Sequence, residues 1–237
     1  MKSRLLAAIA AGALALTAPL LAPSAHAQAA ARLEARDWSR NIVATPEGGF
    51  RMGNPAAPLK LVEYVSLTCG HCRQFAETGA PNLIRSYVRG GRVSFEIRAY
   101  PLDPIAATAA QLQRCAAPAE AFALNDAILV AQPQMIARLE ALTPTEMSAI
   151  DALPPRDLRM RIMQVAGLDA LARQHGVNAA RARACIGDQS GADRLDAMKV
   201  AAERIGVGGT PSFAINGALL PNVHDWTALE PFLIRGR

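Results

Sequence analysis

The sequence lacks several features, and each absence excludes a class of protein. After the apolar run of residues 5–21 no second long apolar run follows, so we expect the mature chain to be soluble. The arginines are scattered, without the compact basic block or interleaved aromatic residues that nucleic-acid binding usually needs, so no nucleic-acid partner is expected. No internal repeat or low-complexity tract interrupts the chain. A chain of 237 residues is long enough to bury a sizeable core, so its length suits one domain, or one domain with an insertion.

The N-terminus has the pattern of a secretory signal peptide. Lys2 and Arg4 precede the apolar run, and Ala25-His26-Ala27 supplies the small-x-small pattern of a cleavage site. We expect residues 1–27 to be removed, which lowers the formal net charge from +5 to +3 because two basic residues and no acidic residue are lost. An uncleaved membrane anchor is the alternative, but prolines interrupt the run, which is short for a span of about 20 residues. Export would place the cysteines in an oxidising compartment.

Residues 59–97 have the pattern of a β-α-β unit. Residues 59–65 form an apolar run that suits a strand buried on both faces, and residues 93–97 alternate between apolar and polar side chains. Between them, residues 73–88 show helical spacing, with Pro81 as a predicted kink. Residues 28–58 are weakly patterned and are predicted to form an N-terminal arm, with one short strand within residues 41–45.

The rest of the chain predicts a block of helices, then a helix, a hairpin and a last helix. Residues 104–187 carry almost no strand signals, so we expect an inserted helical domain between core segments 59–103 and 188–237. In the second core segment, Asn216-Gly217 predicts a hairpin turn and Asp225 the N-cap of the last helix, which runs over residues 226–234. The other expected helices cover residues 105–116, 119–130, 135–142, 157–167, 170–175, 179–186 and 191–205, with Pro144, Pro154 and Pro155 as breaks.

Cys69-Gly70-His71-Cys72 indicates a redox-active pair. Cys69 should lie at the start of a helix, where unpaired N–H groups and the helix dipole favour a thiolate, and Cys72 should lie one turn later as the resolving thiol. A fixed disulfide or half a zinc site is the alternative. Zinc would need a second pair of ligands, and the remaining cysteines form no second C-x-x-C. Covalent haem attachment would need His rather than Arg73 after Cys72. We expect no metal and no cofactor.

Four motifs follow one another along the chain: Met52-Gly53-Asn54-Pro55, Leu61-Val62-Glu63-Tyr64, Cys69-Gly70-His71-Cys72 and Gly209-Thr210-Pro211-Ser212-Phe213. These motifs resemble those of the DsbA-like thiol:disulfide interchange proteins of the bacterial periplasm. The resemblance covers nearly the whole mature chain and rests on motifs that follow one another in the expected order. It implies a thioredoxin-like α/β fold with an inserted helical domain.

Further site residues follow from chemistry and from this resemblance. His71 can stabilise the Cys69 thiolate, or else it is a surface residue without an electronic role. Gly70 stands where similar proteins commonly carry proline, which leaves the redox potential open. The resemblance implies a cis Thr210-Pro211 bond that presents the Thr210 backbone to an extended client, whereas most X-Pro bonds are trans. It also favours Glu63 as a proton relay to Cys72 over a carboxylate that merely reaches solvent.

Two cysteines and two histidines lie outside these motifs. Cys115 and Cys185 are either free buried thiols or a structural disulfide, and a disulfide is the simpler account in an exported chain. His175 and His224 have no partner cluster in the sequence, so we expect ordinary surface or core residues rather than ligands.

We therefore predict a periplasmic dithiol-disulfide oxidase that introduces disulfide bonds into newly exported proteins. Its expected partners are cysteine-containing exported client proteins and a quinone-linked membrane reoxidase. The chain is expected to be monomeric, because few residues precede the core and a separate dimerisation domain would not fit there. An isomerase or reductase of the same fold is one alternative. A chaperone or binding module, in which Cys69 and Cys72 are only structural, is the other.

Overall fold

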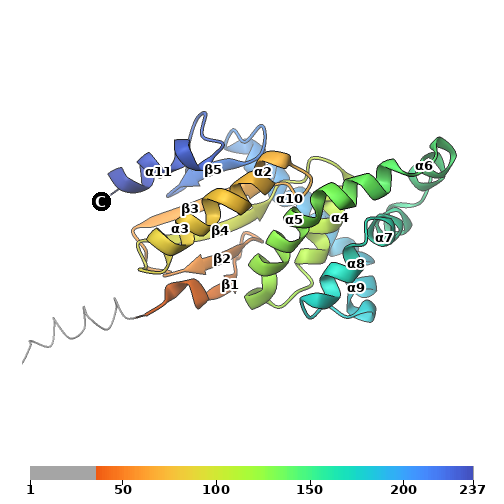
Figure 1. The fold of residues 1–237 in the computed structure, drawn as a ribbon, viewed down its shortest axis with the longest axis horizontal. Helices are drawn as coiled ribbons and strands as arrows, with labels where there is room; N and C mark the ends of the chain where they lie inside the picture. The colour runs from red at the N-terminus through yellow and green to blue at the C-terminus, as the bar shows by residue number, and fades with distance from the viewer. Residues whose placement is uncertain (1–35, 237) are drawn as a thin grey trace, which may run out of the picture.

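The computed structural model describes residues 36–236, and the predicted signal peptide lies outside these residues. Its centre is a six-stranded mixed sheet with the order β1-β2-β4-β3-β5-β6. Figure 1 shows this sheet with helices packed along it and a cluster of further helices at one end of the molecule. The strands are β1 (Ile42–Ala44), β2 (Phe50–Gly53), β3 (Leu59–Val65), β4 (Val93–Ala99), β5 (Ser212–Ile215) and β6 (Ala218–Leu219).

β3 is a central strand, as its apolar run predicted. It pairs in parallel with β4 and antiparallel with β5, and all its residues except Lys60 are buried. A parallel partner is only reached by a crossover, and here the crossover is a helix that begins directly after Cys69 and contains Cys72. The β-α-β prediction is thereby confirmed.

The crossover helix runs without a break from Gly70 to Val88. The helical spacing of residues 73–88 thus continues back to Gly70, and the expected place of Cys69 at the start of a helix is confirmed. It alternates α2 (Gly70–Gln74) and α3 (Ala80–Leu83) with the π-helical turns η2 (Phe75–Gly79) and η3 (Ile84–Val88). Pro81 has no N–H to donate, and the turn before it widens so that Ala80 N–H bonds the carbonyl of Phe75. The chain thus passes Pro81 while keeping its helical path.

Six α-helices lie between β4 and the next helix of the core. The expected break between residues 130 and 135 was wrong, because α5 passes through Pro133 as one helix. Pro144 was also misread as a break: it opens a helix that the sequence did not predict, with a capping box between Thr143 and Glu146. The helices are α4 (Pro104–Gln113), α5 (Ala121–Glu140), α6 (Pro144–Asp151), α7 (Pro155–Val165), α8 (Leu168–Gln174) and α9 (Ala179–Ile186), with short 3₁₀ turns at η1 (Trp38–Arg40) and η4 (Pro118–Glu120).

The last part of the chain returns to the sheet. After α10 (Gln189–Arg204), the hairpin β5–β6 turns at Asn216 and Gly217, both at positive φ, as the Asn-Gly pair predicted. Asp225 caps α11 (Trp226–Arg235) by accepting a 2.8 Å hydrogen bond from the N–H of Ala228. Within the described residues, no helix is both long and apolar enough to cross a membrane.

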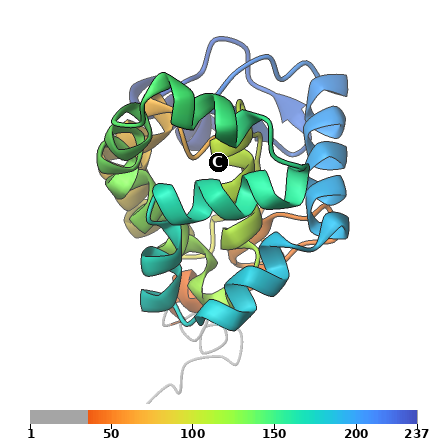
Figure 2. The same ribbon diagram turned by 90° about the vertical axis from the view of Figure 1, so that its right-hand side faces the viewer.

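The two faces of the sheet are covered unequally. On one face, buried residues of the crossover helix and α11 pack against odd-numbered residues of β3 and β4 in one large apolar core. On the other face, α10 contributes Ala202 to a small cluster with Val62, Tyr64, Tyr100 and Ala214. Figure 2 shows α10 standing along one edge of the molecule, beside the cluster formed by α5 to α9. Much of this second face is therefore left without a helix.

Candidate active site

Cys69 is the N-cap of α2. Its backbone is extended (φ −83°, ψ 122°) while its carbonyl already accepts a hydrogen bond from Arg73 N–H, so its sulfur lies beside the unpaired N–H groups of the first turn. Cys69 is partly exposed, whereas Cys72, one turn later, is fully buried. Both are free thiols in the structure. The arrangement gives one accessible sulfur and one hidden behind it.

The surroundings of Cys69 favour its thiolate. A hydrogen bond from the Cys72 thiol lowers the pKa of Cys69 from 9.0 to about 4, and the backbone N–H groups of His71 and Cys72 act in the same direction, against the effect of burial. As a thiol, Cys69 donates to the Thr210 carbonyl at 3.2 Å. The Thr210 hydroxyl is buried without a partner, so it is available to donate once the thiolate forms. At neutral pH, Cys69 is therefore a thiolate.

Cys72 is held in the opposite state. Burial, the hydrogen bond to Cys69 and the nearby Glu63 carboxyl all raise the pKa of the Cys72 thiol far above its usual range. This sulfur stays protonated unless a base removes its proton, and it must regain a proton whenever a disulfide to it is broken.

Glu63 lies beneath the pair on β3, with 4% of its surface exposed. Burial raises the pKa of this carboxyl well above 4.5, and the charges of Asp126 and Cys69 raise it further. Asp126, on α5, was not identified from the sequence; burial raises its pKa too. Its place in an apolar stretch of helix, two residues before the buried Ile128, was the available signal. Glu63 therefore holds its proton more firmly than an exposed carboxyl group does, close to the two cysteines.

The loop before β5 faces Cys69. Its Thr210-Pro211 bond is cis. The Pro211 carbonyl lies 2.8 Å from Nδ1 of His224, so this ring must carry its proton on Nδ1 and donate it. The ring of Phe213 packs edge-on against Phe75 of the crossover helix, with 4.8 Å between ring centroids. The sequence predicted an ordinary surface or core residue at His224; its contact could not be found there, since the partner is a backbone atom 13 residues away.

Helices of the inserted block hold the turn that leads to Cys69. Thr68 donates to the carboxylate of Asp103 at 2.6 Å, and Asp103 is also the N-cap of α4. The buried Gln132 of α5 donates to the Leu67 carbonyl at 3.2 Å. Both residues were missed in the sequence because their partners are 35 and 65 positions away. The position of the nucleophile thus depends on the helical block.

Gly70 and His71 are exposed on the outer side of the pair. A Cβ atom added at Gly70 would meet nothing within 4 Å, so the structure leaves room for a side chain at this position. His71 lines a groove of about 320 Å³ between the crossover helix and the start of α11, with Gln74, Thr78 and Trp226 among its other walls. An extended peptide that reaches Cys69 would find this groove directly beside it.

Cys115 and Cys185 form a disulfide that joins α9 to the residues just after α4. It closes a loop of 70 residues in the helical block. Next to it, the side-chain amide of Gln111 donates to the carbonyls of Cys185 and Asp188 at 2.8 and 2.7 Å. The bridge and Gln111 fix α4 against α9.

Replacing both Cys115 and Cys185 with alanine is expected to lower the free energy of unfolding by about 4 kcal/mol, since a loop of this length is no longer closed in the unfolded chain. Chemical denaturation of the oxidised proteins measures the difference. The redox potential of Cys69 and Cys72 is the internal control and should change little. Equal stability of the variant and the parent would contradict a structural role for the bridge.

A sheet whose central strand ends in C-x-x-C at a helix N-terminus, facing a cis-proline loop, defines the thioredoxin-like fold, here with inserted helices. The family described as Thioredoxin matches residues 45–233. The chain belongs to this family.

Solved structures of related proteins show the same fold. A protein-disulfide isomerase from Novosphingobium aromaticivorans is 32% identical, with a TM-score of 0.74 over 79% of this chain and 96% of that chain. α-DsbA1 of Wolbachia pipientis is 23% identical, with a TM-score of 0.58 over 78% of this chain and 88% of that one. BdbD of Bacillus subtilis is 14% identical, with a TM-score of 0.57 over 78% and 91%.

A provisionally named protein-disulfide oxidoreductase of Rickettsia conorii is 30% identical over 82 residues. These residues make up 34% of this chain and 30% of that relative's length.

Proposed function

We propose that the protein is a thiol:disulfide oxidoreductase that works as an oxidase on the cysteines of other proteins. The observation that carries this proposal is the place of the partly exposed Cys69 at a helix N-terminus, 3.2 Å from the Thr210 carbonyl of a cis-proline loop. These surroundings lower the pKa of Cys69 to about 4, and a groove lies next to the site. A thiolate this stable favours the reduced pair over its disulfide, so the disulfide is readily given away. The names of the relatives, a protein-disulfide isomerase and a provisional protein-disulfide oxidoreductase, support the same chemistry.

In the proposed reaction, the oxidised pair transfers its disulfide in two steps. A client thiolate attacks Cys69 Sγ, the Cys69–Cys72 bond breaks, and Cys72 leaves with the electron pair. Because the Cys72 thiol has a raised pKa, this sulfur takes up a proton, for which Glu63 is the nearby donor. A second client thiolate then attacks the client sulfur, and Cys69 leaves as a stable thiolate. The client gains one disulfide and the pair becomes a dithiol.

The clients in this proposal are extended, cysteine-containing chains. Such a chain can lie along the Thr210-Pro211 loop as an added strand and place neighbouring residues in the groove beside His71. His71 can also stabilise the Cys69 thiolate through the backbone N–H that it already directs at the sulfur. His224 is a positioning residue here, because its bond to the Pro211 carbonyl holds the loop that the client contacts.

The cellular setting is part of the same proposal. We place the protein in the periplasm, exported through a cleaved signal peptide of residues 1–27, as a monomer reoxidised by a quinone-linked membrane protein. The proposed division of the chain is an N-terminal arm (residues 28–58), a thioredoxin-like core (59–103 and 188–237) and an inserted helical domain (104–187). Asp103, the N-cap of α4, accepts a hydrogen bond from Thr68 of the active-site turn, and Gln132 donates one to Leu67. Both bonds support a role for the insertion in positioning Cys69.

Oxidative refolding tests the proposal. The oxidised protein, mixed with a reduced and unfolded protein that needs several disulfides, should restore that client's activity in step with consumption of its own disulfide. Cys69→Ser should abolish this transfer. If Cys69→Ser still promotes refolding at the parental rate, the protein is a chaperone and the proposal fails. Catalysis confined to clients with scrambled disulfides would favour an isomerase instead.

A further inference from the structure

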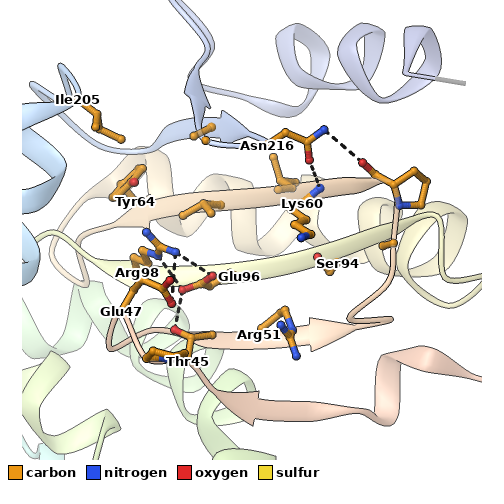
Figure 3. A pocket seen from close by; sticks show the side chains of 17 residues that line it. Thr45, Glu47, Arg51, Lys60, Tyr64, Ser94, Glu96, Arg98, Ile205 and Asn216 are labelled. Carbon is orange, nitrogen blue, oxygen red and sulfur yellow. Dashed lines mark hydrogen bonds and ion pairs between the residues drawn. The ribbon is translucent and has the colours of Figure 1, made fainter.

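The half of the sheet that α10 leaves open forms a groove on the face opposite the crossover helix. Its volume is about 850 Å³, and alternate residues of β2, β3, β4 and β5 make its floor (Figure 3). The proposed oxidase reaction uses no residue of this groove. Lys60, near the start of β3, lies at the end of the strand away from Cys69, which follows the strand's other end. Any ligand here would be remote from the reacting sulfurs.

Near the turn that joins β1 to β2, the charges in the groove are paired. The Glu96 carboxylate accepts hydrogen bonds from Thr45 Oγ1 at 2.8 Å and from Arg98 Nε at 2.7 Å. Arg98 also lies 3.9 Å from the carboxylate of Glu47. Figure 3 shows these side chains joined in one network. The charged groups in this part of the groove already bind one another, so we do not expect them to bind an ion.

The remaining part of the groove contains Lys60 and Arg51, two cations that have no partner among the residues that the structure describes. In the sheet register, Lys60 on β3 lies opposite Ser94 on β4. Arg51 on β2 lies opposite Glu96, two residues further along β4, but its side chain makes no ion pair with that carboxylate. Among the described residues, the Lys60 ammonium and the Arg51 guanidinium have no hydrogen bond or ion pair, and Arg51 Nε is buried. In Figure 3 the three side chains Lys60, Ser94 and Arg51 lie in a row across the strands. We call them the basic row.

The other polar side chain near the basic row is already occupied. Asn216 accepts a hydrogen bond from Lys60 N–H at 2.9 Å and donates to the Pro58 carbonyl at 3.2 Å, so it fixes the hairpin turn. The Glu96 carboxylate is turned to Thr45 and Arg98, although its residue is the register partner of Arg51. Among the described residues, neither cation of the basic row therefore has a hydrogen-bond or ion-pair partner, and a buried donor without an acceptor, here Arg51 Nε, is uncommon in native proteins.

We propose that the basic row binds an oxyanion, the carboxylate or phosphate group of a small molecule. The planar guanidinium of Arg51 suits two oxygens at once, the Lys60 ammonium adds a second positive charge, and the Ser94 hydroxyl supplies a donor on the floor between them. The volume of the groove falls within the range of small-molecule sites, roughly 300–1,000 Å³. The site is independent of the proposed disulfide exchange.

Titration of the full mature protein with inorganic phosphate and, separately, with citrate tests this proposal, at constant ionic strength and followed by NMR chemical shifts. We expect saturable shifts centred on Arg51, Lys60 and Ser94. Arg51→Gln and Lys60→Gln should each weaken binding about tenfold or more, because each removes a charge-assisted hydrogen bond. Tighter binding of phosphate would assign a phosphate ligand, and tighter binding of citrate a carboxylate ligand.

Lys199→Gln is the matched control, since it removes the other lysine of the described chain, whose ammonium lies over the ring of Tyr100 rather than in the basic row. This variant should bind both anions like the parent. Lys60 is exposed, so Lys60→Gln is expected to fold even if Arg51→Gln does not. Non-saturating shifts, or equal binding by Lys60→Gln and Lys199→Gln, would overturn the proposal. Oxidative refolding by the Lys60 and Lys199 variants should equal that of the parent in every case.

Discussion

Replacing Cys72 with serine should turn the protein into a covalent trap for its clients. Cys69 keeps its helix N-terminus and its accessible sulfur, so its thiolate still attacks a disulfide of a client, forms a mixed disulfide with one client sulfur and releases the other as a thiol. Without Cys72, no internal thiol attacks that bond to release the client. Disulfide-linked complexes should therefore accumulate and disappear on reduction. Non-reducing electrophoresis followed by mass spectrometry identifies Cys69 as the linked residue.

Two control variants show whether Cys69 is the nucleophile. Cys69→Ser should form no complexes, because the remaining Cys72 is fully buried and its thiol is held protonated. The double variant Cys69→Ser/Cys72→Ser should behave in the same way. Complexes linked through Cys72 in the Cys69→Ser protein would contradict the assignment of Cys69 as the nucleophile and Cys72 as the resolving thiol.

The reduced protein should titrate a thiolate near pH 4. The pKa of Cys69 is lowered in the folded protein, chiefly by the hydrogen bond from Cys72, to about 4 from the usual 9.0. A group with a depressed folded pKa stabilises the fold fully above its unfolded pKa, and this contribution is lost as pH falls towards the folded pKa. The stability of the reduced protein relative to Cys69→Ser should thus increase from about pH 4 towards pH 9.

Ultraviolet thiolate absorbance gives the titration, and denaturant unfolding at several pH values gives the stability. Cys72→Ser should raise the pKa of Cys69, because serine places a different donor at the position of the largest stabilising contact. The oxidised parent, in which neither sulfur titrates, is the control and should lack this pH dependence. A stability difference that does not change between pH 4 and pH 9 would refute a stabilised thiolate.

The parts of the fold that sequence predicted are those set by local chemistry. The Asn216-Gly217 turn and the Asp225 cap each depend on residues a few positions apart. The same holds for the placement of Cys69, since a buried strand followed by a helical pattern leaves little freedom for the turn between them. The helix breaks expected at proline were wrong because the effect of proline depends on its position: Pro144 opens a helix, and Pro133 lies within one that tertiary packing stabilises.

The parts of the site that sequence did not predict are formed by contacts between distant segments. Asp126 lies close enough to Glu63 to act on its pKa only because α5 packs near the active site. The hydrogen bond from His224 to the Pro211 carbonyl links the segment just before α11 to the cis-proline loop. The strand β2 was missed for a similar reason, since its short segment is stabilised by pairing with β4, about 45 residues away. No periodicity within a single segment carries this information.

The most direct test of the account is the reduction potential of the Cys69–Cys72 pair, obtained by equilibrating the protein with glutathione buffers and scoring the disulfide. An oxidase with a thiolate as stable as that of Cys69 should have a potential near that of the strong oxidant DsbA, about −120 mV. A potential near thioredoxin's, about −270 mV, would mean that the pair accepts disulfides rather than donating them, and would contradict the proposed direction of exchange.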